Sequence, residues 1–312
     1  MKVFIDGSYG TTGLRIHERL KNRSDIELIQ IPYENRHDDS ARLDAYKAAE
    51  IVFTCLPDDA AREAAVMADS CDVRLIDAST AHRTASGWTY GFPEITGADT
   101  IRNSNRIANP GCHASGVNAL LYPLVQKGIL PRDTLLSCFS ITGYSGGGKK
   151  MIGQYEESGR DSLLDAPRMY GLSQKHKHLP EIVAVSGLAS EPVFCPIVSD
   201  YYSGMETIIP LFHSQIKGSP EDIRETYQNF YTGPLVKYTP NADENGFTSA
   251  GSMSGRDDME ISVYGNADRI LLLARFDNLG KGASGSAIQN LNLMMGIDET
   301  TGLNLGGVSL ED

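Results

Sequence analysis

The N-terminal stretch of the chain constrains its fold more than any other segment. A short apolar run at residues 3–5 stops at Asp6, and glycines follow at positions 7, 10 and 13. Residues 14–20 then carry apolar side chains at helical spacing. A buried strand, a glycine turn and a helix in this order predict an alternating chain that folds around a parallel sheet.

The alternation continues through the first hundred residues. We predict strands at residues 27–31, 51–56 and 73–77, with a helix at 60–68. Such a chain forms an α/β domain with a doubly wound parallel sheet, whose ligand lies at the carboxyl ends of the strands. The residues expected to border that crevice are Gly7, Ser8, Tyr9, Gly10, Thr11, Thr12, Gly13, Leu56, Pro57 and Ser79.

The glycine turn suits a dinucleotide. Gly7 allows a tight turn, Gly10 lets the backbone approach a pyrophosphate, and Gly13 lets the helix pack closely on the strand. The GxxGxxG spacing differs from GxGxxG, so a plain glycine turn remains an alternative. Arg36, beyond the second strand, favours NADP(H) because an arginine can accept a 2′-phosphate, whereas Glu34 nearby would suit NAD and a solvated loop arginine is also compatible.

Cys112 is the candidate nucleophile. Asn109, Pro110 and Gly111 predict a sharp turn, and residues 112–121 predict a helix that begins at the cysteine. Unpaired amides and the positive end of the helix dipole favour a thiolate there. The alternative is an inert, buried thiol.

The remainder of the chain predicts a second domain with a mixed sheet. Strands are expected at residues 134–141, 194–198, 206–212, 261–264 and 270–276, and a helix at 220–231; one sheet face could serve as an oligomer interface. Ser145, Gly146 and Lys149 lie in a glycine-rich segment that suits either an anion cradle or a flexible loop. Residues 280–285 predict a turn that opens an amphipathic helix and returns it to the first domain.

Two histidines, His176 and His178, lie two residues apart. On an extended segment they would share one side, an arrangement that also suits a metal, but no third ligand cluster is evident. We therefore expect no metal and assign one imidazole as the acid/base that a cysteine nucleophile requires.

Composition narrows the partners. The chain has 312 residues and a formal net charge of −12, which argues against nucleic acid and anionic membranes and favours a small-molecule ligand. Five cysteines without a CxxC pair suit a reducing cytoplasm. The chain starts directly with an apolar strand and has no apolar run near eighteen residues, so we expect a protein without leader or membrane span.

Four segments together resemble the N-acetyl-gamma-glutamyl-phosphate reductases of arginine biosynthesis, in particular their shorter type. These segments are the glycine turn, Asn109 to Cys112, His176 to Glu181, and Gly280 to Asn290. The resemblance covers nearly the whole chain. It departs from many relatives in the GSYGTTG turn and in His113, where others carry a tyrosine.

The resemblance implies a fold like that of glyceraldehyde-phosphate dehydrogenase. Residues 1–111 and a C-terminal helix at 283–312 would form the dinucleotide domain, and residues 112–282 the catalytic and oligomerisation domain of a homodimer or homotetramer. It implies Cys112 as nucleophile, His178 as acid/base, and Tyr170 and Glu181 as supporting residues. Gly282 and Asn290 would lie beside NADP(H). Substrate phosphate and carboxylate would be held by residues among Asn109, Arg83, Arg106, Ser145, Gly146, Lys149 and Lys150.

The expected reaction is the NADPH-dependent reduction of N-acetylglutamyl phosphate to its semialdehyde and phosphate through a Cys112 thioester. Three alternatives remain at this point. Aspartate-semialdehyde dehydrogenase, or another acyl-phosphate reductase, shares the cysteine, the histidine and the fold. A thiol hydrolase or acyltransferase would use Cys112 and His178 without a nucleotide. A dinucleotide-binding redox sensor would carry a reactive thiol without turnover.

Overall fold

The short apolar runs of the N-terminal third pair into one parallel sheet. The computed structural model describes residues 1–306 of the chain. Its first sheet has the order β2-β1-β3-β4-β6-β5, and every neighbouring pair is parallel. The strands are β1 (Lys2–Asp6), β2 (Glu27–Ile29), β3 (Ile51–Thr54), β4 (Arg74–Asp77), β5 (Thr89–Tyr90) and β6 (Arg106–Ala108).

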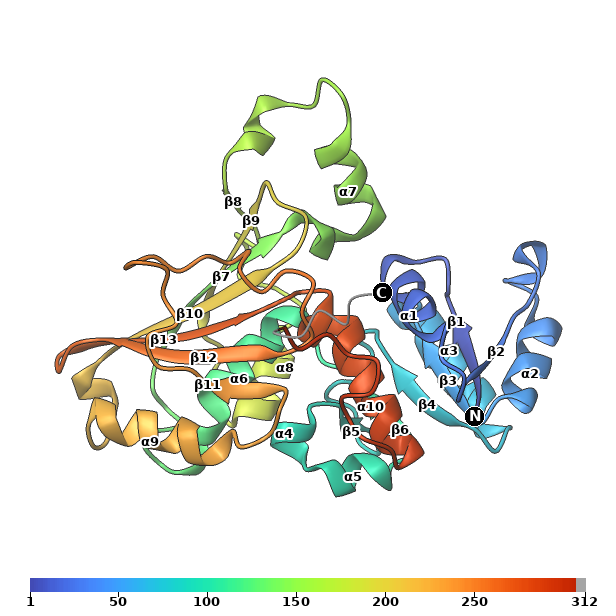
Figure 1. Cartoon of the computed structure of the whole chain (residues 1–312), viewed down its shortest axis with the longest axis horizontal. Coiled ribbons are helices and arrows are strands. Elements are labelled where there is room, and N and C mark those ends of the chain that lie inside the picture. Colours follow the sequence, from blue (N-terminus) through green and yellow to red (C-terminus); the bar gives the residue numbers. More distant parts are fainter. Residues whose placement is uncertain (307–312) are drawn as a thin grey trace. The chain divides into compact units, whose positions relative to one another are not determined.

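Helices cover both faces of this sheet, because alternate residues of each buried strand point to opposite sides. Val3 and Ile5 pack in one core with residues of α1, α5 and α10, whereas Phe4 packs in the other with Tyr46 of α2 and Ala64 of α3. The doubly wound prediction is confirmed (Figure 1). The helices are α1 (Thr11–Leu20), α2 (Asp39–Ala48), α3 (Asp58–Asp69), α4 (Pro93–Thr96), α5 (Ala98–Arg102) and α10 (Gly285–Met295).

The last helix corrects two expectations. Helix α10 is buried on all sides rather than amphipathic, because its polar side chains bond to other buried groups. It ends at Met295, where Gly296 adopts the left-handed conformation with φ 72°. Residues 296–306 continue without a helix, so the predicted helix at 283–312 is too long; residues 307–312 lie outside the described part of the chain.

The second sheet is mixed, as predicted. Its order is β11-β12-β13-β10-β7-β9-β8, with parallel pairs β7/β9 and β11/β12 among antiparallel ones. The strands are β7 (Ser137–Gly143), β8 (Arg168–Met169), β9 (Val193–Ser199), β10 (Met205–Phe212), β11 (Val236–Tyr238), β12 (Met259–Gly265) and β13 (Arg269–Phe276).

Helices α6 (Cys112–Gln126) and α9 (Pro220–Phe230) pack on one face of this sheet, and α8 (Leu179–Ser186) packs against α6. Ser219 caps α9, and its hydroxyl and the Asp222 carboxylate each bond to the other's backbone amide. Helix α7 (Gly148–Glu156) lies between β7 and β8, away from the sheet (Figure 1). The loop alternative for residues 142–150 is therefore wrong, because a 3-10 turn, η2 (Tyr144–Gly147), leads directly into this helix.

The chain divides into two compact units. The first comprises Met1–Gly111 and Ala283–Leu303, and the second comprises Cys112–Gly282 and residues 304–306. The remaining short elements are the 3-10 turns η1 (Tyr33–Asn35), η3 (Ser162–Asp165) and η4 (His213–Gln215) and the π-helical turn η5 (Gly280–Ser284). No helix within residues 1–306 is long and apolar enough to cross a membrane.

Candidate functional site

The glycine turn after β1 packs tightly against the end of β3 and leaves open backbone where α1 begins. Gly7 has φ +86°, and a Cβ there would lie 2.4 Å from the carbonyl oxygen of Cys55. A Cβ at Gly13 would lie 2.3 Å from the Gly7 carbonyl oxygen, whereas one at Gly10 would meet nothing closer than 3.5 Å. Two glycines are thus needed for packing, and Gly10 leaves open backbone at the start of α1. Open backbone at a helix N-terminus is the kind of position at which phosphate groups bind in dinucleotide folds.

Aromatic rings connect the turn to the end of β2. Tyr9 meets Tyr33 edge to face at a centroid distance of 4.8 Å. The Arg36 guanidinium lies 3.8 Å from the centre of the Tyr33 ring, and its Nη1 donates to the Tyr33 carbonyl oxygen at 2.8 Å. A hollow beside these rings is lined by Ser8, Tyr9, Leu14, His17 and residues of β1 and β2. Arg36 is therefore held near the turn.

The end of β4 is tied together by Asp77, which the sequence reasoning missed. Its two oxygens accept from the Thr54 hydroxyl at 2.7 Å, the Ser79 amide at 3.1 Å and the Ser79 hydroxyl at 2.6 Å. His82 Nδ1 lies 2.7 Å from the same carboxylate, and its ring stacks on Trp88 at 4.0 Å. The Ser79 hydroxyl is thus committed to the protein. Leu56 packs in the core and Pro57 precedes α3.

Three predicted ligand residues of the first unit hold the chain that precedes Cys112. Arg83 Nε donates to the Asn109 carbonyl at 3.0 Å and its Nη2 to the Ala78 carbonyl at 3.2 Å. The Asn109 amide donates to the Ala283 carbonyl. Asn290, fully buried, donates to the Gly91 carbonyl at 2.9 Å and to Asn109 Oδ1 at 3.2 Å. Arg106 bonds to the Val73 carbonyl and Asp69 at the sheet edge.

Cys112 is the first residue of α6, as predicted, and is half-buried. Its neighbour Gly282 is buried, and a Cβ on this glycine would lie 3.0 Å from the Cys112 Cβ. The glycine therefore lets the backbone approach the cysteine closely. A cysteine that is not fully buried at a helix N-terminus occupies a position that favours the thiolate form.

An aromatic cluster surrounds the residue next to the thiol. The His113 ring lies 5.6 Å from His176, 5.5 Å from His178, 6.2 Å from Tyr170 and 5.3 Å from Phe194, all between centroids. Both predicted histidines thus lie close to the helix start that carries Cys112. Burial lowers the pKa of His176 below its usual value, with a smaller effect from the Lys177 charge.

The histidine segment is not extended, which corrects the sequence reasoning. His178 is the N-cap of α8, and Pro180 in the first turn favours a helix start. The His178 amide donates to His176 Nδ1 at 3.3 Å. The His178 side chain and Glu181, one turn further along α8, are both buried.

His113 is a central residue of this cluster that the sequence reasoning did not identify. Its Nδ1 lies 2.7 Å from the Ser140 hydroxyl and its Nε2 lies 2.7 Å from the Tyr170 hydroxyl. Burial lowers the pKa of His113 to about 3, with smaller contributions from His176 and Lys177. Burial, and then the Cys112 charge, raises the pKa of the Tyr170 hydroxyl.

The segment predicted to bind an anion has a buried part and an exposed part. Ser145 is buried, and its hydroxyl accepts from the Asn278 amide at 3.0 Å. Gly146 and Lys149 are exposed at the start of α7, as is Lys150. Thus only the exposed part of this segment remains available to an anion.

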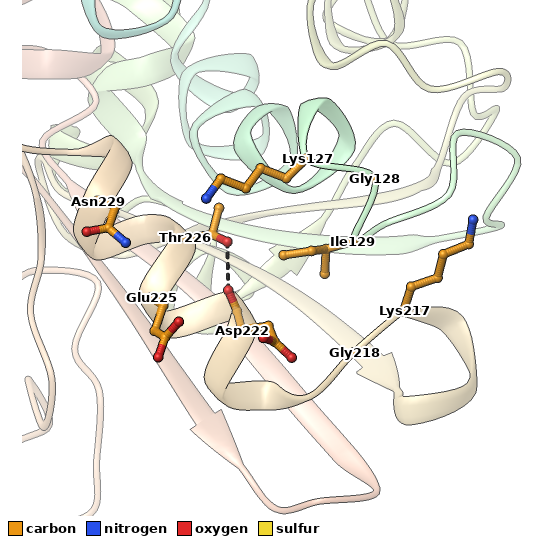
Figure 2. Close-up of a pocket in the computed structure, with 9 residues that line it drawn as sticks. All are labelled: Lys127, Gly128, Ile129, Lys217, Gly218, Asp222, Glu225, Thr226 and Asn229. Carbon is orange, nitrogen blue, oxygen red and sulfur yellow. Dashed lines mark hydrogen bonds between the residues drawn. The ribbon is translucent and has the colours of Figure 1, made fainter.

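A separate pocket lies at the opposite end of α6 from Cys112. Its lining includes Lys127, Lys217, Asp222 and Glu225, and the Thr226 hydroxyl donates to the Asp222 carbonyl (Figure 2). Helix α6 has 15 residues, so its two ends are about 20 Å apart. This pocket does not belong to the Cys112 cluster. Within residues 1–306, no group of three or more His, Cys, Asp or Glu side chains could hold a metal ion.

Each of the two units matches a family model of known proteins. Residues 2–104 match the family model of the NAD binding domain of semialdehyde dehydrogenases, and residues 112–278 match the model of their dimerisation domain. The first unit is therefore a nicotinamide-nucleotide-binding domain of this superfamily. Aspartate semialdehyde dehydrogenase II of Vibrio cholerae superposes with a TM-score of 0.70 at 15% identity, covering 94% of this chain and 98% of that one. A probable aspartate-semialdehyde dehydrogenase of Pseudomonas aeruginosa gives 0.71 at 15%, with 95% and 98% covered.

Sequence relatives narrow the family. N-acetyl-gamma-glutamyl-phosphate reductase 2 of Nostoc sp. is 42% identical, covering 97% of this chain and 99% of its own. N-acetyl-gamma-glutamyl-phosphate reductase 2 of Pseudomonas putida is 43% identical, with 94% and 96% covered. The chain belongs to the N-acetyl-gamma-glutamyl-phosphate reductase family. The aspartate-semialdehyde dehydrogenases share its fold, whereas the N-acetyl-gamma-glutamyl-phosphate reductases share its sequence along almost the entire length, which confirms the resemblance.

Proposed function

We propose that this protein reduces N-acetyl-L-glutamyl 5-phosphate to N-acetyl-L-glutamate 5-semialdehyde and phosphate in arginine biosynthesis, with NADPH as reductant. The observation that carries the proposal is the partly exposed Cys112 at the N-terminus of α6, whose neighbour His113 lies close to two histidines and a tyrosine, in a chain of this family. All five cysteines are free, which suits a reducing compartment such as the cytoplasm.

Cys112 would carry the acyl group. Its thiolate attacks the acyl carbon, the carbon–oxygen bond to phosphate breaks, and a thioester forms. When bound, the reduced nicotinamide supplies the hydride. The tetrahedral oxyanion that is still bonded to the Cys112 sulfur then collapses. Its carbon–sulfur bond breaks, which releases the aldehyde and returns the thiolate. His178, buried near the start of α6, would hold or donate a proton at the carbonyl oxygen. Glu181 on the same helix would fix the orientation of His178.

The supporting residues divide between cofactor and substrate. Gly7 to Gly13 would hold the pyrophosphate, with Leu56, Pro57 and Ser79 bordering the same strand ends. Arg83, Asn109 and Asn290 hold the chain just before Cys112 and connect it to the Ala283 carbonyl through their hydrogen bonds. Lys149 and the Gly146 amide remain candidates for the substrate phosphate, because both are exposed at a helix start.

We propose NADP rather than NAD on the strength of Arg36. Its guanidinium is positioned by the Tyr33 ring at the end of β2, where a 2′-phosphate binds in dinucleotide folds. For Arg36→Ala we expect the preference for NADPH over NADH, measured as the ratio of kcat/KM values, to fall about tenfold, since one charge-assisted contact is lost. Arg19→Ala, on α1, is the control. An unchanged ratio in Arg36→Ala would remove this residue as the 2′-phosphate ligand.

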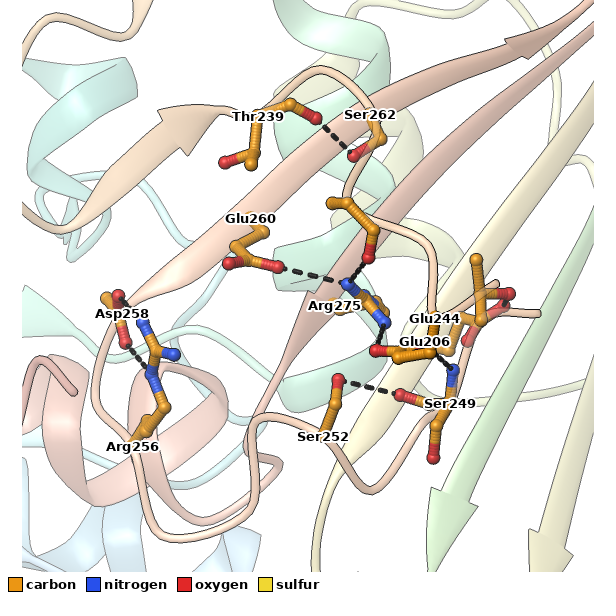
Figure 3. A network of polar contacts seen from close by, with 12 residues as sticks. Glu206, Thr239, Glu244, Ser249, Ser252, Arg256, Asp258, Glu260, Ser262 and Arg275 are labelled. Atoms are coloured by element: carbon orange, nitrogen blue, oxygen red, sulfur yellow. Dashed lines mark hydrogen bonds and ion pairs between the residues drawn. The ribbon is translucent and has the colours of Figure 1, made fainter. Parts of the chain in front are cut away.

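A second copy of the chain would cover the open face of the mixed sheet. Phe139, Leu271, Val193 and Phe212 are exposed there, on the side opposite α6. One part of this face is already covered: Arg275, buried, pairs with Glu244 at 2.6 Å and Glu260 at 3.2 Å, and so holds the segment after β11 (Figure 3). An apolar face beside such a segment, in a unit that matches a dimerisation model, favours a homodimer or a tetramer built from it.

The reverse reaction tests the proposed function. We expect NADPH to form from N-acetylglutamate semialdehyde and NADP⁺ only while phosphate is present, because phosphate must displace the acyl group from the thiol. Aspartate semialdehyde is the matched control substrate. Turnover that is independent of phosphate, or faster with the aspartate compound, would contradict the proposal.

Light scattering of Leu271→Asp against the parent tests the proposed dimer face. We expect loss of the oligomer, and an unchanged mass would exclude this face.

A further inference from the structure

A series of hydrogen-bonded polar side chains runs from the centre of the mixed sheet through His113, the neighbour of Cys112, to Tyr170. The hydroxyls of Thr207 on β10 and Ser140 on β7 are 3.3 Å apart. Ser140 Oγ lies 2.7 Å from His113 Nδ1, and His113 Nε2 lies 2.7 Å from the Tyr170 hydroxyl. Thr207, Ser140 and His113 are all buried. Residues this deep in a core are ordinarily apolar, so the presence of these hydrogen-bonded polar side chains requires an explanation.

The imidazole at its centre is neutral. The groups that face it are His176 and His178 from the α8 segment, Tyr170, and Lys177 at longer range. Burial and two of these charges, His176 and Lys177, keep its pKa at about 3. A neutral imidazole has one N–H and one acceptor nitrogen. His113 can therefore donate to Ser140 or to Tyr170, but never to both.

Only two directions of hydrogen bonding satisfy this constraint. In the first, Thr207 donates to Ser140, Ser140 to His113 Nδ1, and His113 Nε2–H to the Tyr170 oxygen, which leaves the Tyr170 proton for another acceptor. In the second, every donor points the opposite way, and the Tyr170 oxygen presents lone pairs. Tyr170 is bonded to the residue that directly follows Cys112 at the start of α6, and the Cys112 charge contributes to the raised pKa of its hydroxyl. A thiolate accepts from a donor and is repelled by lone pairs, so it selects the first direction.

We propose that His113 is a positioning residue for the nucleophile: it donates through Nε2 to Tyr170, which in turn directs its hydroxyl proton to the Cys112 thiolate. Ser140 and Thr207 fix the imidazole tautomer. The inference rests on the proposed role of Cys112 and adds to it a source of thiolate stabilisation other than the helix dipole. Donors arranged in series polarise one another, so the terminal bond to sulfur is stronger than an isolated tyrosine would make.

The test is the pH profile of Cys112 alkylation by iodoacetamide, followed by mass spectrometry of the peptide that contains Cys112. It requires neither substrate nor NADPH, so its failure is separate from failure of the reductase assay. For Tyr170→Phe we expect the apparent thiol pKa to rise by about 1 unit, which lowers the alkylation rate about tenfold at a pH below both values. For His113→Phe, which keeps a ring of similar size, we expect a rise of about 0.5 unit.

The double variant shows whether His113 acts on Cys112 through Tyr170 or independently of it. In Tyr170→Phe/His113→Phe the pKa should be no higher than in Tyr170→Phe alone, because His113 acts only through Tyr170. Ser140→Ala, a milder change in case His113→Phe folds poorly, should shift the profile in the same direction. Its matched control is Ser262→Ala, which removes a buried serine of the same sheet whose hydroxyl bonds elsewhere, to Thr239. Additive shifts in the double variant, or an unshifted profile in Ser140→Ala, would overturn the proposal.

Discussion

Each unit of this protein contains a buried histidine bonded to a serine-containing network, and the two networks differ in how they end. In the first unit His82 pairs with the Asp77 carboxylate, which also takes three bonds from Thr54 and Ser79. That network is closed upon itself. In the second unit both ring nitrogens of His113 bond to hydroxyl groups instead, those of Ser140 and Tyr170, and the network lies next to Cys112 in the sequence.

The difference shows how similar residues serve separate purposes. A carboxylate with four hydrogen bonds fixes the backbone at the end of β4, which carries the loop to Arg83. A neutral imidazole between two hydroxyls instead transmits a direction of hydrogen bonding. We therefore expect damage to the first network to lower stability and damage to the second to lower the reaction rate.

The largest effect is expected at the end of the second network. Cys112→Ser should lower kcat by more than about 10⁴-fold, because no other group can carry the acyl intermediate. NADPH binding, followed by fluorescence titration, should remain within about twofold. Cys71→Ser, a free cysteine of the other unit, is the control. A turnover close to that of the parent would rule out the covalent route.

His178→Ala should lower kcat by roughly 10²- to 10⁴-fold and change the shape of the pH–rate profile, as expected for loss of a general acid/base. His176→Ala, two residues away in the same cluster, should lose only a fewfold. If the two variants exchange these outcomes, the proton role belongs to His176.

The first network should respond through stability. Asp77→Ala leaves the Thr54 and Ser79 donors and His82 without their shared carboxylate, at a cost of about 2–4 kcal/mol in the free energy of unfolding. Urea denaturation measures it, with Asp72→Ala on the exposed turn before β4 as control. A loss below about 0.5 kcal/mol would mean that the closed network does not hold this loop.

The smallest expected effect is a change in how the stability of the protein depends on acidic pH. The pKa of His113 is about 3 in the folded protein, against roughly 6.5 in an unfolded chain. Below about pH 6.5 the unfolded state binds the extra proton, so stability falls as pH drops towards 3, by up to about 1.4 kcal/mol per pH unit, and is unaffected above. Urea denaturation at pH 7.5 and pH 5 should show a smaller acid loss in His113→Phe than in the parent. Equal losses would remove His113 as the source.

Local patterns predicted the parts of the site that depend on local geometry. The first strand, the glycine turn and the first helix are all contained in residues 2–20, and the proline and glycine before Cys112 mark a turn directly before a helix. Both predictions depend only on residues that are close to one another in the sequence. The relatives then supplied the substrate, which no turn or helix start encodes.

The remainder depended on pairing between distant residues. His113 meets Ser140 and Tyr170 only because β7 and the residue after β8 lie next to the start of α6, a relation that no sequence periodicity reveals. Helix α10 was expected to be amphipathic because Asn290 and Asn292 resemble surface residues, yet both lie inside and bond to backbone carbonyls. Asp77 was missed because one acidic residue after a strand does not reveal three polar partners.

Direct detection of the acyl group on Cys112 is the most direct test of the central claim. Enzyme mixed with N-acetylglutamyl phosphate in the absence of NADPH, quenched in acid and digested, should release about one phosphate per active subunit. The peptide that begins the α6 helix should gain the mass of one N-acetylglutamyl group, which hydroxylamine removes. A phosphate burst without acylation of this peptide, or acylation of a different residue, would contradict the account.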